Sequence, residues 1–213
     1  MNKKLLIFDF DGTIADTFMH IYNTFKRCIV KYDLNDISVE DFLKINGSSL
    51  IEILKFLGAS VDNLEEIKIF YRKSFLDDIS DIIIYDNVKD TLVKLKDMGF
   101  LLAIATNRDS NSLTYMLKEF GLFDLFDTFV GIDQVKDGKP DPGMIYLILN
   151  ELGVSSYEVI MFGDTDFDVI LGKNANIGTC YVCHTIDLDS KVIDCNPDYV
   201  IYNYNEIFDI LNK

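Results

Sequence analysis

The stretch LLIFDFDGT, residues 5–13, decides how the rest of the chain is interpreted. Its four consecutive apolar residues are typical of a strand buried on both faces of a sheet. The strand ends in Asp9 and Asp11, whose carboxylates repel each other. Such a pair is costly to bury unless a cation lies on it or one member holds a proton. With Gly12 as a turn residue, the stretch predicts a buried strand that delivers two carboxylates to a polar site.

The composition limits the classes of partner. The chain has 213 residues, 49% of them hydrophobic, and a formal net charge of −15. This hydrophobic fraction is enough for a good globular core. The negative charge argues against nucleic acid and against anionic membranes as partners. An anionic substrate would need a local positive site made by a metal ion or by a few placed lysines. The composition leaves the oligomeric state open.

The cysteines and the start of the chain indicate a cytoplasmic protein. Only four apolar residues precede Asp9, which is too few for a secretory signal. No stretch approaches the roughly 20 apolar residues of a membrane span. The run 180–184, CYVCH, matches redox and haem-attachment patterns, but it lies in an apolar, β-favouring segment, so we expect ordinary strand residues there. The cysteines expected to be reduced thiols are Cys28, Cys180, Cys183 and Cys195.

Strands and helices alternate over most of the chain, which predicts an α/β fold. Residues 14–81 are the exception, because their apolar periodicity is helical throughout. The apolar strands expected after them are typical of a parallel sheet covered on both faces. We therefore expect an α/β core made of residues 1–13 and 82–213, with a helical insertion at 14–81. The expected strands are 4–9, 100–105, 128–132, 158–162, 177–182 and 199–201. The expected helices are 14–32, 38–45, 48 or 49 to 57, 64–79, 86–97, 110–120, 142–152, 167–175 and 205–211.

Four polar segments lie at the ends of these apolar strands: DFDGT, TNRDS, DGKPDP and GDTDFD. Ligands of open parallel sheets bind beyond the carboxyl ends of the strands, so the segments should converge there. The candidate site residues that they carry are Asp9, Asp11, Thr106, Asn107, Lys139, Asp164, Asp166 and Asp168. We expect Asp166 to be a solvated acid in the first turn of a helix.

The chemistry of this set points to magnesium and phosphate. Several carboxylates without histidine or cysteine are hard oxygen ligands, which suit Mg²⁺. A hydroxyl, an amide and an ammonium group beside them would donate to phosphoryl oxygens. Asp9 can attack phosphorus to form an aspartyl phosphate. Asp11 can protonate the leaving alkoxide and then take a proton from water.

The four segments, in this order, resemble the motifs of the haloacid dehalogenase-like hydrolases. The resemblance covers nearly the whole chain. It implies a Rossmann-like core, with Asp9 as nucleophile and Asp11 as acid/base. It also implies that Thr106 and Lys139 bind the phosphate and that Asn107 is the residue common after the motif threonine.

The same resemblance implies how Mg²⁺ is held. Asp164 and the backbone carbonyl of Asp11 would bind the ion beside the nucleophile Asp9. Asp168 would lie near the ion and act on it directly or through water. We therefore expect Mg²⁺ as cofactor, with Asp9, Asp11, Asp164 and Asp168 around it.

Within the family, the sequence resembles the phosphoglycolate phosphatase-like branch. Asp11 argues against the dehalogenases, and Thr13 resembles a phosphatase more than a phosphoglucomutase. The helical insertion resembles a cap, in which Gly47 and Ser48 are expected to contact the substrate. Arg108 departs from the residue common at its position. We expect a magnesium-dependent phosphatase of small phosphorylated metabolites. The alternatives are a phosphotransferase or mutase on the same fold and a non-catalytic regulatory binding protein.

Overall fold

The computed structural model of the protein describes residues 3–77, 79–184 and 190–212, and it consists of two compact units. The core unit comprises Met1–Ala15 and Ile84–Lys213, and the helical unit comprises Asp16–Ile83. The chain passes from one unit to the other in two short strands that pair with each other, β2 (Ala15–Asp16) and β3 (Ile83–Ile84). The division thus lies two residues beyond each of the positions expected from the sequence, 14 and 81.

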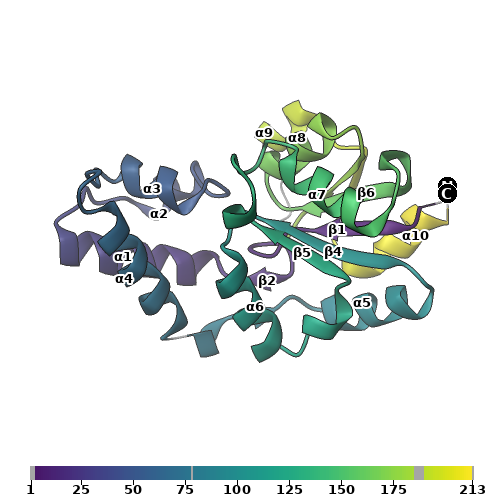
Figure 1. Cartoon of the computed structure of the whole chain (residues 1–213), viewed down its shortest axis with the longest axis horizontal. Helices are drawn as coiled ribbons and strands as arrows, with labels where there is room; N and C mark the ends of the chain where they lie inside the picture. Colours follow the sequence, from purple (N-terminus) through teal and green to yellow (C-terminus); the bar gives the residue numbers. More distant parts are fainter. Residues whose placement is uncertain (1–2, 78, 185–189, 213) are drawn as a thin grey trace. The chain divides into compact units, whose positions relative to one another are not determined.

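A parallel six-stranded sheet forms the centre of the core unit (Figure 1). Its strand order is β5-β4-β1-β6-β7-β8, and the registered neighbours are parallel. The predicted α/β class with a Rossmann-like parallel sheet is confirmed. The strands are β1 (Leu5–Phe8), β4 (Leu101–Thr106), β5 (Thr128–Gly131), β6 (Val159–Gly163), β7 (Gly178–Val182) and β8 (Tyr199–Ile201).

Helices cover both faces of this sheet, which explains why its strands are apolar without alternation. In Figure 1, α7, α8 and α9 lie on one face and α5, α6 and α10 on the other. Leu5 and Ile7 of β1 belong to the apolar cluster that α7 and α8 complete. Because side chains alternate along a strand, Leu6 and Phe8 point to the other face. The helices are α5 (Val88–Asp97), α6 (Ser110–Glu119), α7 (Gly143–Leu152), α8 (Asp166–Asn174), α9 (Ser190–Cys195) and α10 (Ile207–Leu211).

The helical unit is built around α1 (Phe18–Tyr32), which packs against α4 (Leu64–Leu76). Aromatic rings form much of its interior: Phe25 contacts the rings of Phe42 and Tyr71 at centroid distances of 5.6 and 4.6 Å. Two short helices complete the unit, α2 (Val39–Leu43) and α3 (Leu50–Phe56). The expected helix start at residue 14 is wrong. Ala15 pairs in β2 and is buried in the core unit together with Ile14, so α1 begins only at Phe18.

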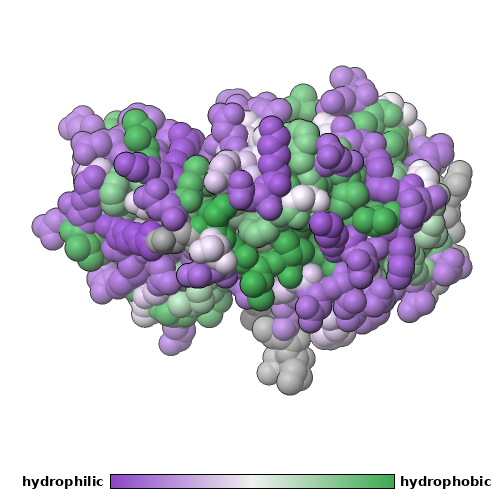
Figure 2. Space-filling view, turned by 90° about the horizontal axis from the view of Figure 1, so that it is seen from below, coloured by the Kyte–Doolittle hydropathy of each residue, from purple (hydrophilic) through white to green (hydrophobic). Residues whose placement is uncertain are grey.

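The surface and the thiols fit the composition. Figure 2 shows hydrophilic side chains over much of the face that it draws, with hydrophobic ones between them. Across the described ranges, no helix combines the length and the apolarity needed to cross a bilayer. The cysteines are free thiols. Cys180 lies in β7, and Cys183 follows it as a buried residue in a small apolar cluster with Tyr181 and Val192.

Candidate active site

The candidate active site lies at the carboxyl ends of three neighbouring strands. Asp9 follows β1 directly, and its N–H donates to the carbonyl of Phe162 in β6 at 2.8 Å. Asp164 follows β6, and Thr106 is the last residue of β4. From β1 the chain builds β4 and β5 on one side of the sheet, and β6 to β8 extend the other side. This reversal beside β1 is where open α/β sheets form their ligand crevices.

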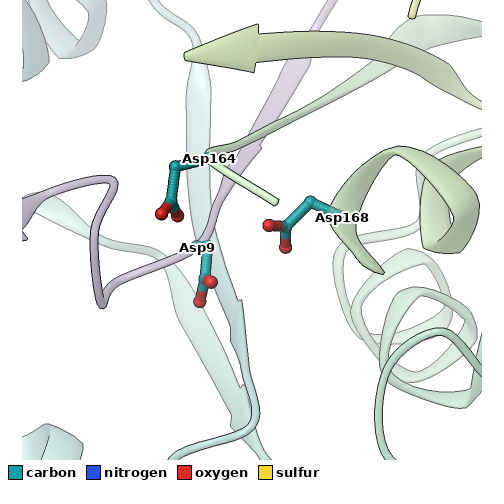
Figure 3. A group of neighbouring side chains, drawn as sticks. All are labelled: Asp9, Asp164 and Asp168. Carbon is teal, nitrogen blue, oxygen red and sulfur yellow. The ribbon is translucent and has the colours of Figure 1, made fainter. Parts of the chain in front are cut away.

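Three of the expected carboxylates form one group. Oxygens of Asp9, Asp164 and Asp168 lie within 4.8 Å of one another (Figure 3). Asp9 and Asp168 are buried, and Asp164 is partly buried. Figure 3 shows that the three side chains come from separate segments and converge on one point. An all-oxygen set of this size and charge is the kind of ligand set that binds Mg²⁺.

The turn after β1 is shaped around Asp164. Gly12 has φ +74°, a left-handed conformation that glycine adopts without steric cost. Thr13 follows it, and its Oγ1 donates to Oδ1 of Asp164 at 2.9 Å. The carbonyl of Thr13 accepts a hydrogen bond from the buried hydroxyl of Tyr204. The turn therefore connects the first motif to the fourth and to the C-terminal part of the core unit.

Lys139 supplies a cation to the carboxylate group. Its ammonium lies 2.6 Å from Oδ1 of Asp168 and 2.9 Å from Oδ1 of Asp9, and the side chain is almost fully buried. Asp168 is held in turn by Thr165, whose N–H and Oγ1 donate to its Oδ2 at 3.1 and 2.7 Å. Asp168 thus uses one oxygen for the lysine and the other for the start of α8.

The electrostatics of the group show that one lysine does not balance the negative charge. Burial raises the pKa of Asp9 to about 7, and the charges of Asp168 and Asp11 raise it further against the opposing effect of Lys139. Burial, followed by the charges of Asp168 and Asp9, also raises the pKa of Asp164 well above its ordinary value. For Lys139, burial lowers the pKa, but the two carboxylates outweigh this effect and the pKa is raised. A bound divalent cation would relieve the excess of negative charge.

The second motif reaches the site through Thr106 and Asn107. Thr106 is buried at the end of β4, and its Oγ1 accepts a hydrogen bond from the N–H of Arg108 at 3.2 Å. The side-chain oxygen of Asn107 accepts from the N–H of Lys139 at 2.9 Å. A β carbon on Gly138 would lie 2.5 Å from that same oxygen, so the two loops are closely packed. Asn107 therefore positions the backbone that carries Lys139.

The carboxylate of Asp11 has a different partner from the other acids. Arg108 donates to both of its oxygens, from Nη2 at 2.6 Å and from Nε at 2.9 Å. Within the described ranges, the group of acids that could share an ion consists of Asp9, Asp164 and Asp168, and the side chain of Asp11 is not in it. The sequence reasoning noted Arg108 only as a departure from the family pattern and missed this ion pair. A cation two residues after the motif threonine was the available signal.

The two candidates of the helical unit lie in the turn between α2 and α3. Gly47 has φ +90°, and the N–H of Ser48 donates to the carbonyl of Ile45 at 3.2 Å. The residue that caps α3 is Ser49, which forms a reciprocal capping box with Glu52. Gly47 and Ser48 thus belong to a turn of the helical unit and not to the group at the strand ends. Asp166 lies in the first turn of α8, partly exposed.

Comparisons with known proteins agree with this geometry. Residues 6–182 match the model of the haloacid dehalogenase-like hydrolase family. The pyrophosphatase PpaX of Bacillus velezensis is 33% identical over 96% of this chain and 94% of its own length.

Solved structures show the same architecture. A predicted phosphoglycolate phosphatase from Haemophilus somnus superposes with a TM-score of 0.87 at 20% identity, over 99% of each chain. A candidate β-phosphoglucomutase from Thermotoga maritima superposes with a TM-score of 0.76 at 26% identity, over 98% of each chain. The fold, the expected resemblance and the hydrolase class are confirmed: the chain belongs to the family of haloacid dehalogenase-like hydrolases.

Proposed function

We propose that the protein is a magnesium-dependent phosphatase that hydrolyses small phosphorylated metabolites through an aspartyl-phosphate intermediate. The observation that carries the proposal is the group formed by Asp9, Asp164 and Asp168 with the buried Lys139 among them. Three carboxylates and one ammonium leave a net negative site that requires a further cation. A phosphate could then be bound by that cation, by Lys139 and by the hydroxyl of Thr106.

Asp9 is the proposed nucleophile. Its Oδ1 accepts from the N–H of Phe10 at 2.7 Å and lies 2.9 Å from the ammonium of Lys139. These contacts fix the carboxylate, and they leave Oδ2 as the proposed attacking atom. Attack by Oδ2 forms the bond to phosphorus while the bond to the leaving oxygen breaks. A water molecule then cleaves the aspartyl phosphate and releases inorganic phosphate.

Asp11 is the proposed acid and base. It gives a proton to the leaving oxygen in the first step and takes one from the attacking water in the second. Asp9, Asp164 and the backbone carbonyl of Asp11 are the proposed ligands of Mg²⁺. When bound, the ion would polarise the phosphoryl group and neutralise the carboxylates. Asp168, whose oxygens are taken by Lys139 and Thr165, acts in this proposal by holding the lysine.

The helical unit is the proposed cap. Its insertion point directly after the first motif supports this role, because a mobile lid there can select the leaving group and exclude water. Gly47 and Ser48 are proposed as substrate contacts of the cap. Pyrophosphate and phosphoglycolate are the first substrates to test, because similar proteins carry the names pyrophosphatase and predicted phosphoglycolate phosphatase.

The decisive experiment measures released phosphate from a panel of phosphorylated compounds, with Mg²⁺ and with excess chelator. The panel contains pyrophosphate, phosphoglycolate, sugar phosphates and p-nitrophenyl phosphate. We expect Mg²⁺-dependent release by the natural chain and none by Asp9→Asn, while Asp11→Asn is slowed by about 100-fold or more. A phosphate adduct on the peptide that contains Asp9 would identify the intermediate. Normal turnover by Asp9→Asn would overturn the mechanism.

A mutase is the second candidate. The similarity to the candidate β-phosphoglucomutase, 26% identical over 98% of both chains, favours keeping it. A mutase returns the phosphoryl group of Asp9 to a sugar instead of to water. Isomerised sugar phosphate formed faster than free phosphate would therefore support the mutase over the phosphatase. A non-catalytic binding protein would show neither product.

A further inference from the structure

Arg108 grips both oxygens of Asp11. Its Nε donates to Oδ2 at 2.9 Å and its Nη2 to Oδ1 at 2.6 Å. A bidentate pair of this kind fixes the plane of a carboxylate as well as its position. The pair is largely withdrawn from water, since the side chains of Arg108 and Asp11 are only 7% and 23% exposed. Salt therefore screens it weakly.

Arg108 is itself held firmly. Its Nη1 donates to Oγ of Ser112 at 2.8 Å, and its own N–H donates to Oγ1 of Thr106 at 3.2 Å. Its carbonyl accepts from the N–H of Ile132 at 3.1 Å. A β carbon on Gly131 would lie 2.7 Å from that carbonyl, so β5 packs directly on this loop. The guanidinium is thus mounted on the sheet and on α6, and it transmits this rigidity to Asp11.

We propose that Arg108 is a positioning residue that aims the carboxylate of Asp11 at the leaving group. This inference rests on the proposed function, in which Asp11 moves protons. A group that moves a proton must lie within hydrogen-bond reach of it, and an error of 1 Å can cost about 100-fold in rate. Asp11 lies in a turn after the strand, where its side chain needs such a support. The arrangement matches the general pattern in which a third group orients a catalytic base.

The proton balance leaves Arg108 unchanged. In the first step the proton passes from Asp11 to the leaving oxygen as its bond to phosphorus breaks. In the second step a proton passes from water to Asp11. The guanidinium keeps all of its protons throughout. Because its charge stabilises the carboxylate that forms as the proton leaves, Arg108 favours the transition state of the first step over the ground state.

The leaving group of the substrate provides the test. Nitrophenolate leaves without a proton, whereas an alkoxide needs one. In Arg108→Met we expect kcat/KM for an alkyl phosphate to fall by about 10- to 100-fold and for p-nitrophenyl phosphate by less than about 3-fold. The ratio kcat/KM includes only steps up to departure of the leaving group, so the later water step does not enter it.

Other roles of Arg108 give a different pattern. If it only stabilised the loop, or only bound the phosphoryl group, both substrates would lose kcat/KM by the same factor. An equal loss therefore overturns the proposal. Arg108→Lys keeps a charge but cannot hold both oxygens, so it should retain the steep dependence on the leaving group. Full recovery by lysine would overturn the bidentate clamp.

Two further variants complete the experiment. Ser112→Ala removes one support of the guanidinium and should shift the substrate ratio in the same direction by a smaller factor. Lys96→Gln breaks another half-buried ion pair of the core unit, the one with Asp127, and should leave the ratio unchanged. Failure of the proposed function is recognised separately, because the natural chain would then release no phosphate or Asp9→Asn would still turn over.

Discussion

A β carbon placed on Gly12 would lie 2.1 Å from Oδ2 of Asp164 and 2.7 Å from its Cγ. The first and fourth motifs therefore approach each other so closely that only a hydrogen atom fits between them at this point. The left-handed φ of +74° at Gly12 adds a second reason for glycine. Backbone and carboxylate are thus matched to each other across two neighbouring strands.

Gly12→Ala should damage the metal site more than it damages the fold. The new methyl group must displace Asp164, and we expect Mg²⁺-dependent turnover to fall by about 100-fold or more. The strained φ should cost about 1 to 2 kcal/mol of unfolding free energy. Turnover and thermal unfolding are the measurements.

Gly99→Ala is the matched control. Gly99 has φ +86°, but nothing lies within 4 Å of the position that a β carbon would take there. This variant should lose a similar amount of stability and keep its turnover. Equal loss of turnover in both variants would show that strain alone, and not the contact with Asp164, explains the effect.

Lys139→Met should raise the substrate concentration needed for turnover and should destabilise the protein. Without its charge, Asp9 and Asp168 stay buried together, and breaking a buried ion pair typically costs about 3 kcal/mol or more. A phosphate would also lose a donor, so kcat/KM should fall by about 100-fold or more. Steady-state kinetics and thermal unfolding measure the two effects. Lys136→Met, on a fully solvated side chain of the same loop, should change neither.

The parts of this site that the sequence predicted follow from strand pattern and strand direction. Apolar runs without alternation indicate strands covered on both faces, and parallel strands place their carboxyl ends together. This was enough to expect Asp9, Asp164 and Lys139 at one edge of the sheet. The segments meet there because β1, β4 and β6 are neighbours.

What the sequence did not predict depends on contacts between distant residues. The strands β2 and β3 have two residues each, too few for a periodic pattern, so the start of α1 was placed too early. The pairing of Arg108 with Asp11 spans 97 positions, and several acids on converging loops could have been its partner. The use of Asn107 to hold the Lys139 loop is equally a matter of distance, because the residue type alone fits a phosphate contact as well.

Asp168→Asn tests whether this residue binds the ion or holds the lysine. Its Oδ1 lies 2.6 Å from the ammonium of Lys139. We expect the variant to lose about 10- to 100-fold in turnover while Mg²⁺ still binds. Asp164→Asn should instead lose most Mg²⁺ affinity by calorimetry. Similar losses of affinity in both variants would assign Asp168 as a direct ligand.

The pH dependence of stability should reveal the raised pKa of Asp9. Its pKa of about 7 in the folded chain lies above the ordinary value of 3.8, because burial disfavours the charged form. Between these values the folded protein keeps a proton that the unfolded chain has lost, so the unfolding free energy falls as the pH rises from about 4 to about 7. Asp164 acts in the same direction, since its pKa is also raised.

Mg²⁺ should therefore stabilise the protein more at pH 8 than at pH 5. The ion binds carboxylates and competes with their protons, and at pH 8 it relieves repulsion that protons already relieve at pH 5. The measurement is the melting temperature with excess chelator and with Mg²⁺ at both pH values. In Asp9→Asn one of the titrating groups is gone, so the chelated protein should vary less with pH. An increase in melting temperature that is the same at pH 5 and pH 8 would mean that the ion does not bind at these carboxylates.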